Sequence, residues 1–189
     1  MDGDSIFLLE DGGRLRPMAE RPYDNEDDLQ RLLEEWPELL AGSQMNRAEP
    51  RRWILVSREA TVPDSEESTG RWSLDHLFLD QDAIPTLVEV KRSSDTRIRR
   101  EVVGQMLDYA ANVVSYWTIQ TVKSKLEERC SQKGIDPVRA VADLIKKPSE
   151  DEEAIEAFWK SVEINLGAGR VRLLFVADRI PSTKGTLDL

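Results

Sequence analysis

The sequence has very few of the residues that cross-link small secreted domains or bind transition metals. Its 189 residues include one cysteine, Cys130, and one histidine, His76. An internal disulfide needs a second cysteine, and a structural zinc site needs about four cysteine or histidine ligands, so both are excluded. A mechanism that uses two histidines is excluded as well. We therefore expect a reducing, cytoplasmic location.

Long apolar runs are also missing. None approaches the roughly 20 residues that span a bilayer, so we expect no contact with membranes. The first residues carry acids where a secretory signal needs bases. Hydrophobic residues nevertheless make up 40% of the chain, which is enough for a packed core. We expect one domain over residues 23–180, with an N-terminal extension over 1–22 and a C-terminal tail over 181–189.

The net charge of −10 is unevenly distributed. Residues 1–67 hold 17 acids and 8 bases, whereas residues 68–189 hold 19 acids and 18 bases. Within the second part, Lys91–Arg100 carries five bases and one acid. A local patch, rather than the total charge, decides whether a phosphate backbone can approach. The acidic total therefore does not exclude nucleic acid as a partner.

Hydrophobic periodicity predicts alternating helices and strands. The pattern favours a mixed sheet flanked by helices. In chain order we expect a short strand at Ser5–Leu9, a helix at Asn25–Leu40, strands at Arg52–Arg58, Arg71–Leu79 and Pro85–Lys91, helices at Thr96–Trp117 and Thr118–Lys133, two helices starting at Asp136-Pro137 and Pro148-Ser149, and a final hairpin of Ser161–Leu166 and Val171–Ala177.

Three charged residues, Asp75, Glu89 and Lys91, are expected to lie close together on two neighbouring strands. Alternation along a strand puts Glu89 and Lys91 on one face. If the short hairpin closes with Asp80 opposite Ile84, Asp75 lies opposite Glu89. Two carboxylates held a few ångströms apart repel each other unless a cation lies between them. A hard divalent ion such as Mg²⁺ meets this need, and a neighbouring lysine can orient a water and stabilise developing charge.

These residues resemble the motif of the PD-(D/E)xK nuclease superfamily, in which Asp75 is followed by the strand-ending triplet Glu89-Val90-Lys91. The helix that follows the strand ending at Lys91 carries Gln105 and Tyr109. These two residues look like the QxxxY motif of the RecB-type branch of that superfamily. The resemblance implies a restriction-endonuclease-like αβββαβ core, with extra helices between the core helix and the last hairpin.

The same resemblance implies a hydrolase that cleaves phosphodiester bonds with Mg²⁺ or Mn²⁺, with DNA as the expected substrate. Asp75, Glu89 and the Val90 carbonyl would hold the metal, and Lys91 would position the attacking water. Gln105, Tyr109 and an acid on the first helix would be accessory. For that acid Glu26 is preferred to Asp28 without a decisive reason. A homodimer is one possible assembly.

The basic segment is the candidate nucleic-acid contact. Arg97, Arg99 and Arg100 open the helix that carries the QxxxY residues, and Arg92 follows the lysine strand. Basic residues at a helix N-terminus oppose the helix dipole, so contact with phosphate is an attractive reason for their presence. The simpler interpretation is that these arginines are an ordinary solvent-exposed start of a helix without a binding role.

Simpler interpretations exist for the other residues too. Glu89 and Lys91 could be a structural ion pair, and Gln105 with Tyr109 could be the rim of a packed helix face. His76 falls on the strand face opposite Asp75, so we expect it to be half-buried without a catalytic role. Two other functions remain open. One is an inactive nuclease-fold module that binds nucleic acid or protein in repair or defence, and the other is an acidic interaction domain that uses residues 1–67.

Overall fold

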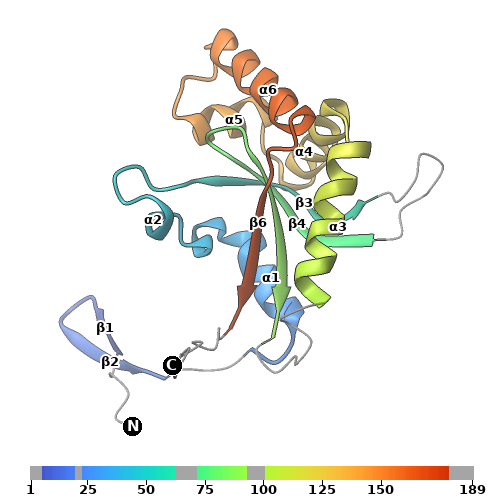
Figure 1. Cartoon of the computed structure of the whole chain (residues 1–189). Helices are drawn as coiled ribbons and strands as arrows, with labels where there is room; N and C mark the ends of the chain where they lie inside the picture. The colour runs from blue at the N-terminus through green and yellow to red at the C-terminus, as the bar shows by residue number, and fades with distance from the viewer. Residues whose placement is uncertain (1–5, 20–22, 63–71, 93–100, 179–189) are drawn as a thin grey trace, which may run out of the picture.

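The computed structural model describes residues 6–19, 23–62, 72–92 and 101–178 (Figure 1). It has an α/β architecture in which helices flank a sheet. The elements are β1 (Ile6–Glu10), β2 (Arg14–Met18), α1 (Glu26–Glu35), the 3₁₀ helix η1 (Pro37–Leu40), α2 (Gly42–Met45), β3 (Trp53–Val62), β4 (Trp72–Asp80), β5 (Pro85–Lys91), α3 (Glu101–Tyr116), α4 (Ile119–Lys133), α5 (Pro137–Ile145), α6 (Glu152–Gly167) and β6 (Arg172–Ala177).

The main sheet has four strands in the order β3-β4-β5-β6. β3, β4 and β5 are antiparallel neighbours, and β6 lies parallel to β5. The mixed sheet flanked by helices is therefore confirmed. The described part of the chain between β5 and β6 forms four helices, α3–α6, because a parallel neighbour needs a crossover connection rather than a tight turn.

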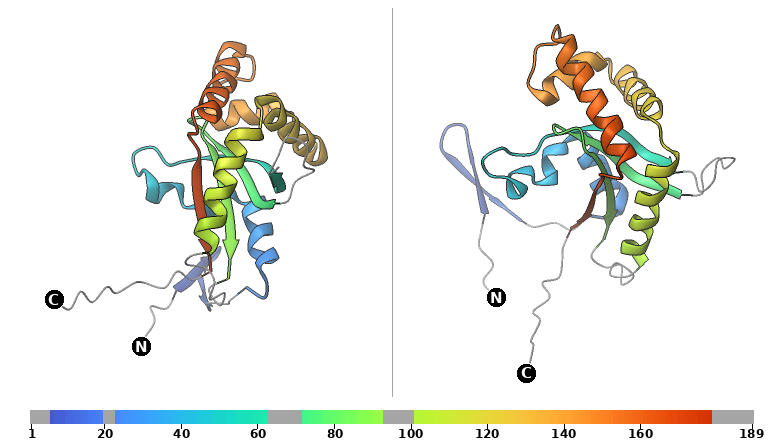
Figure 2. Two further views of the ribbon diagram at one scale, coloured as in Figure 1. Left: turned by 45° about the vertical axis from the view of Figure 1, so that its right-hand side comes forward. Right: turned by 45° about the horizontal axis from the view of Figure 1, so that its top comes forward.

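The sheet separates two hydrophobic cores. On one face, α1 packs Leu29 and Leu33 against Phe78 and Val88. On the opposite face, α3 and the later helices cover a larger core that includes Leu77, Leu79 and Leu87. Figure 2 shows α3 running along the sheet and α4–α6 gathered at one end of it. β5 is consequently buried on both faces, as its continuous apolar sequence predicts.

Several helix boundaries follow from local capping chemistry. The Asn25 side chain accepts a hydrogen bond from the backbone N–H of Asp28 at the start of α1. Thr118 caps α4 in the same way, and Gly134 ends that helix in a left-handed conformation. The helix predicted over 25–40 is interrupted, because Pro37 has no N–H with which to continue the ladder of α1. A 3₁₀ turn, η1, replaces its last part.

The predicted final hairpin is wrong. Residues 161–166 are not a strand but the second half of α6, and only the later strand exists, as β6. Val162 and Leu166 continue the buried stripe that Ile155 and Phe158 begin, so the helical period places all four in the core. The turn Gly167-Ala168-Gly169 ends a helix rather than joining two strands, and it delivers β6 to the edge beside β5.

The N-terminal extension contains more structure than the single strand predicted. β1 and β2 form a separate antiparallel pair, joined through Gly12 and Gly13 in positive-φ conformations. The predicted strand at 52–58 also runs further, to Val62, past a bulge between Leu55 and Ser57. Of the described helices, none combines the length and the apolar character needed to cross a membrane.

Candidate active site

Asp75 and Glu89 lie on neighbouring antiparallel strands, β4 and β5. The observed register pairs His76 with Val88, and its continuation by one residue puts Asp75 opposite Glu89. The Asp80 N–H donates to the Ile84 carbonyl at 3.2 Å, which closes the hairpin as predicted. The Val90 N–H donates to Asp75 Oδ2 at 2.7 Å. The β4–β5 hairpin therefore fixes the Asp75 carboxylate against the strand that carries Glu89.

Burial and mutual repulsion disfavour two charges on this pair. Glu89 is only 2% exposed. Burial, followed by the charge of Glu89, raises the pKa of Asp75 from its ordinary value of 3.8 to about 7. Burial also raises the pKa of Glu89, although its hydrogen bond with Lys91 opposes the rise. Near neutral pH the site consequently holds fewer negative charges than its two carboxyl groups could carry.

Lys91 supplies the positive charge of the site. Its Nζ atom lies 2.8 Å from Glu89 Oε1 and 3.8 Å from Glu26 Oε2. Burial lowers the pKa of Lys91, but the hydrogen bond and the charge of Glu89 outweigh it, and the pKa is raised overall. The lysine is therefore held protonated beside the carboxylates.

The first helix contributes Glu26 from the other side of β5. Glu26 Oε1 accepts a hydrogen bond from the Arg92 backbone N–H at 3.2 Å, just beyond the end of β5. Asp28, the alternative acid, instead pairs with Arg31 on the surface of α1. Of the two acids considered from the sequence, Glu26 is the one that reaches Lys91.

Gln105 and Tyr109 border this cluster from α3. The Gln105 amide donates to the Tyr109 hydroxyl, which in turn donates to the Ser73 carbonyl at 3.1 Å, near the start of β4. Burial raises the pKa of Tyr109, and the charges of Glu89 and Asp75 add to the effect. Tyr109 therefore lies within electrostatic range of the carboxylates, and Gln105 is one turn away on the helix that covers the same face of the sheet.

The donor set suits a hard cation only in part. Across the described ranges, no group of three or more His, Cys, Asp and Glu side chains is arranged as a metal site. Glu89 Oε2, however, is buried and lacks a hydrogen-bond partner in that part of the chain. Mg²⁺ is typically held by one or two carboxylates, with water and substrate oxygens completing its shell. Asp75 and Glu89 face each other, and with Glu89 Oε2 unpaired among the described residues they fit such a two-carboxylate site.

The proposed nucleic-acid contacts are only partly visible. Arg97, Arg99 and Arg100 lie outside the described residues. Arg92 is described, and its guanidinium donates to the Asp24 carbonyl at 2.9 Å. In this structure Arg92 therefore fastens the segment before α1 to the end of β5.

His76 is more buried than expected. It is fully enclosed on the α1 side of the sheet, with Nε2 3.0 Å from the Gln30 carbonyl oxygen. Burial lowers its pKa to about 4, so the ring is neutral near pH 7. Its place on the face opposite the carboxylates agrees with the alternation of the strand.

Sequence reasoning missed a second buried charge cluster at the far end of the same hairpin. Asp80 is completely buried and binds Arg51 at 2.9 Å and Arg172. Its other oxygen accepts the backbone N–H groups of Asp82 and Ile84 at 3.0 and 2.9 Å. These interactions of Asp80 hold together the turn, the segment before β3 and the start of β6, so its role is structural. The two arginines lie far from it in sequence, and no local motif signals the cluster.

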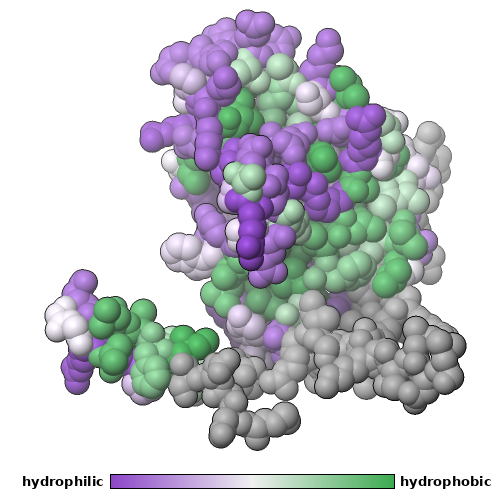
Figure 3. Space-filling model, turned by 60° about the vertical axis from the view of Figure 1, so that its left-hand side comes forward, coloured by the Kyte–Doolittle hydropathy of each residue, from purple (hydrophilic) through white to green (hydrophobic). Residues whose placement is uncertain are grey.

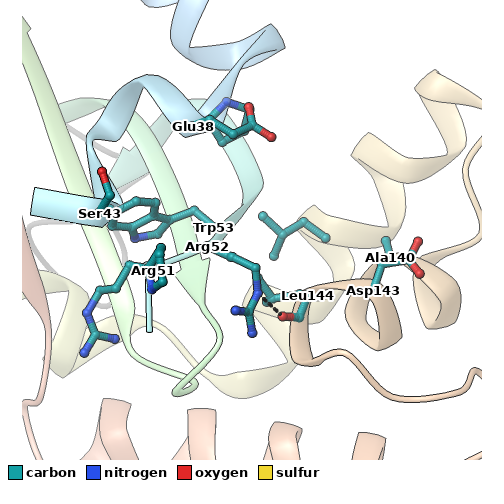
Figure 4. A pocket seen from close by; sticks show the side chains of 12 residues that line it. Glu38, Ser43, Arg51, Arg52, Trp53, Ala140, Asp143 and Leu144 are labelled. Carbon is teal, nitrogen blue, oxygen red and sulfur yellow. Dashed lines mark hydrogen bonds between the residues drawn. The ribbon is translucent and has the colours of Figure 1, made fainter. Parts of the chain in front are cut away.

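A cavity of about 480 Å³ also lies at that end of the molecule, away from Asp75 and Glu89 (Figure 4). Trp53 forms part of its wall, and Arg52 Nε donates to the Leu144 carbonyl at 3.0 Å across its rim. No residue of the predicted site lines it. The candidate active site is instead the charged cluster on β4, β5 and α1.

Comparison of the chain with protein-family models, with curated proteins and with solved structures finds no match.

Proposed function

We propose that the chain is a metal-dependent nuclease of the PD-(D/E)xK type that hydrolyses phosphodiester bonds in DNA. The observation that carries this proposal is the pair of facing acids, half-buried Asp75 and buried Glu89, with Lys91 Nζ 2.8 Å from Glu89. A structural ion pair needs one acid and one base. Here a second, half-buried acid, Asp75, raises the electrostatic cost of the cluster, and such perturbed groups concentrate at functional sites.

Each residue has a role that its position supports. Asp75 and Glu89 would bind Mg²⁺ or Mn²⁺, with the Val90 carbonyl as a further ligand. A divalent ion bound there supplies Lewis-acid chemistry, which acidifies water and neutralises phosphate oxygens. Lys91, protonated and held by Glu89, orients the attacking water and stabilises the charge that develops on the phosphate. Glu26, whose Oε2 lies 3.8 Å from Lys91 Nζ, and Gln105 on α3 would be accessory groups.

One alternative is a nuclease fold without activity that binds nucleic acid or protein. The observation in its favour is the contact between Lys91 and Glu89, because an ammonium group that already neutralises Glu89 reduces the need for a metal. The two functions differ in whether the protein cleaves nucleic acid when Mg²⁺ or Mn²⁺ is supplied.

The test measures cleavage and Mn²⁺ binding on the same samples. Supercoiled plasmid, single-stranded DNA and RNA are incubated with the protein in Mg²⁺ or Mn²⁺, and Mn²⁺ binding is followed by electron paramagnetic resonance. We expect DNA cleavage that excess EDTA stops. We also expect Asp75→Asn and Glu89→Gln to lose both cleavage and Mn²⁺ binding.

The matched control is Asp143→Asn, since Asp143 is an exposed carboxylate on α5 and far from the cluster. It should keep both properties. Mn²⁺ binding by the wild type without cleavage of any substrate would favour the inactive module. A wild type that neither binds Mn²⁺ nor cleaves would eliminate the nuclease proposal.

A further inference from the structure

The β1–β2 hairpin exposes apolar side chains on both of its faces. Ile6 is 70% exposed, Leu9 66% and Leu15 62%, and Phe7, Leu8 and Met18 are each about half exposed. The hairpin projects from the body in both views of Figure 2. Figure 3 shows it apart from the body, with hydrophobic side chains beside hydrophilic ones, and a further hydrophobic area low on the body. A two-stranded hairpin alone is marginally stable in water, so this element needs a surface that covers it.

A surface with matching properties lies on the main sheet. β6 is an edge strand, and no second strand pairs with its outer side in the described part of the chain. Phe175, 43% exposed, points to the α3 face, the same side as Leu173. An uncovered apolar edge is a template for pairing with another strand.

Helix α3 continues this surface. Val103 and Leu107 are four residues apart, so they share one stripe of the helix, and Leu107 is 59% exposed. Val114 belongs to the same stripe and lies within 4 Å of the position that a side chain on Gly169 would take. Since Gly169 precedes β6, the C-terminal end of the α3 stripe lies near the start of β6. We call the exposed side chains of this stripe together with Phe175 of β6, which no other described element covers, the α3–β6 face.

We propose that two copies of this chain form a twofold dimer in which the hairpin of each copy pairs with β6 and covers the α3–β6 face of the other. Both halves of the contact are present on one chain, which is the requirement for a closed twofold arrangement. Six large exposed side chains per hairpin, used twice, supply apolar area on the scale of a stable dimer, about 1,200–2,000 Å² in total.

The charge of the hairpin favours a protein surface over an anionic one. Glu10 and Asp11 balance Arg14 and Arg16, so β1–β2 is neutral within an acidic chain. Arg16 is already within 3.5 Å of Glu10. Membrane surfaces and nucleic acids attract clusters of unpaired bases, and the hairpin offers none. A neutral apolar hairpin can, however, approach a second acidic copy without repulsion.

The test is the mass of the full chain in solution, measured by light scattering over a dilution series without metal or nucleic acid. We expect a dimer for the wild type. Phe7→Glu with Leu9→Glu, and separately Leu107→Glu, should give monomers with an unchanged circular dichroism spectrum, because these side chains are exposed within one chain. Ile135→Glu is the matched control, since Ile135 is comparably exposed on the α4–α5 connection, and it should remain a dimer.

Cross-linking decides which surfaces meet. In a Cys130→Ser background, one chain carries Leu9→Cys and a differently tagged chain carries Phe175→Cys. We expect a bis-maleimide to join the two tags. A monomeric wild type, a dimer that survives the hairpin substitutions, or a Leu9→Cys, Phe175→Cys double variant that cross-links only within one chain would overturn the proposal. None of these readouts depends on nuclease activity.

Discussion

Replacing Asp75 with asparagine should stabilise the metal-free protein while abolishing its proposed activity. The pKa of Asp75 is raised from 3.8 to about 7, mainly by burial and then by the charge of Glu89. Because the folded state binds the proton more tightly than the unfolded state, ionisation of Asp75 destabilises the fold. The penalty begins near pH 4, grows as the pH rises, and is complete above about pH 7.

The size of the effect follows from the two pKa values. The full difference corresponds to roughly 4 kcal/mol above pH 7, and solvent access and relaxation reduce this to about 2–3 kcal/mol. An asparagine keeps an oxygen for the Val90 N–H but carries no charge. For a chain of this length, the gain corresponds to a rise in Tm of about 4–12 °C.

The assay is thermal and urea unfolding of both proteins in EDTA between pH 5 and pH 8. The stabilisation by Asp75→Asn should be largest at pH 8 and shrink toward pH 5. Adding Mn²⁺ should raise the Tm of the wild type but not that of the variant, since only the wild type keeps both carboxylates. Asp143→Asn should change neither result. A variant less stable than the wild type at pH 8 in EDTA would refute the reasoning.

Three other predictions concern the remaining charged groups. Lys91→Ala should lower single-turnover cleavage by about 10²–10³-fold while Mn²⁺ binding is retained, because the lysine acts on the water and the transition state. Asp80→Asn should destabilise the protein by about 3–5 kcal/mol in urea unfolding, since it leaves two partly buried arginines without their shared carboxylate. Replacing Arg97, Arg99 and Arg100 with alanine should weaken binding to a short duplex and reduce its salt slope by about 0.7–0.9 for each lost phosphate contact, in affinity measurements over a salt series. An unchanged slope would identify these arginines as an ordinary solvated surface.

The register of the candidate site could be predicted from sequence because a short turn determines it. The connection between Asp80 and Pro85 is too short to permit many pairings, so Asp75 and Glu89 can be placed opposite each other without a structure. The helix starts at Asn25, Thr118 and Asp136 were predictable for a similar reason, since each capping side chain accepts a bond from a backbone N–H three residues later.

Features that depend on distant partners could not be predicted in this way. The segment Ser161–Leu166 satisfies a strand period and a helix period, and only the core formed with Ile155 and Phe158 decides between them. The Asp80 cluster needs Arg51 and Arg172, which the fold brings together across 29 and 92 residues. Likewise, β6 could be recognised as a strand, but its place parallel to β5 depends on the whole path of α3–α6.

The parallel arrival of β6 has a consequence for the order of folding. β4 and β5 join through a local turn, whereas β6 pairs with β5 only after an excursion of four helices, which closes a long loop at an entropic cost. We therefore expect Asp75, Glu89 and Lys91 to meet while they are still hydrated and to lose that water only when α3 and β6 dock. The unfavourable electrostatic energy of the cluster would then arise only after the folding transition state. Asp75→Asn should therefore slow unfolding and leave the folding rate nearly unchanged.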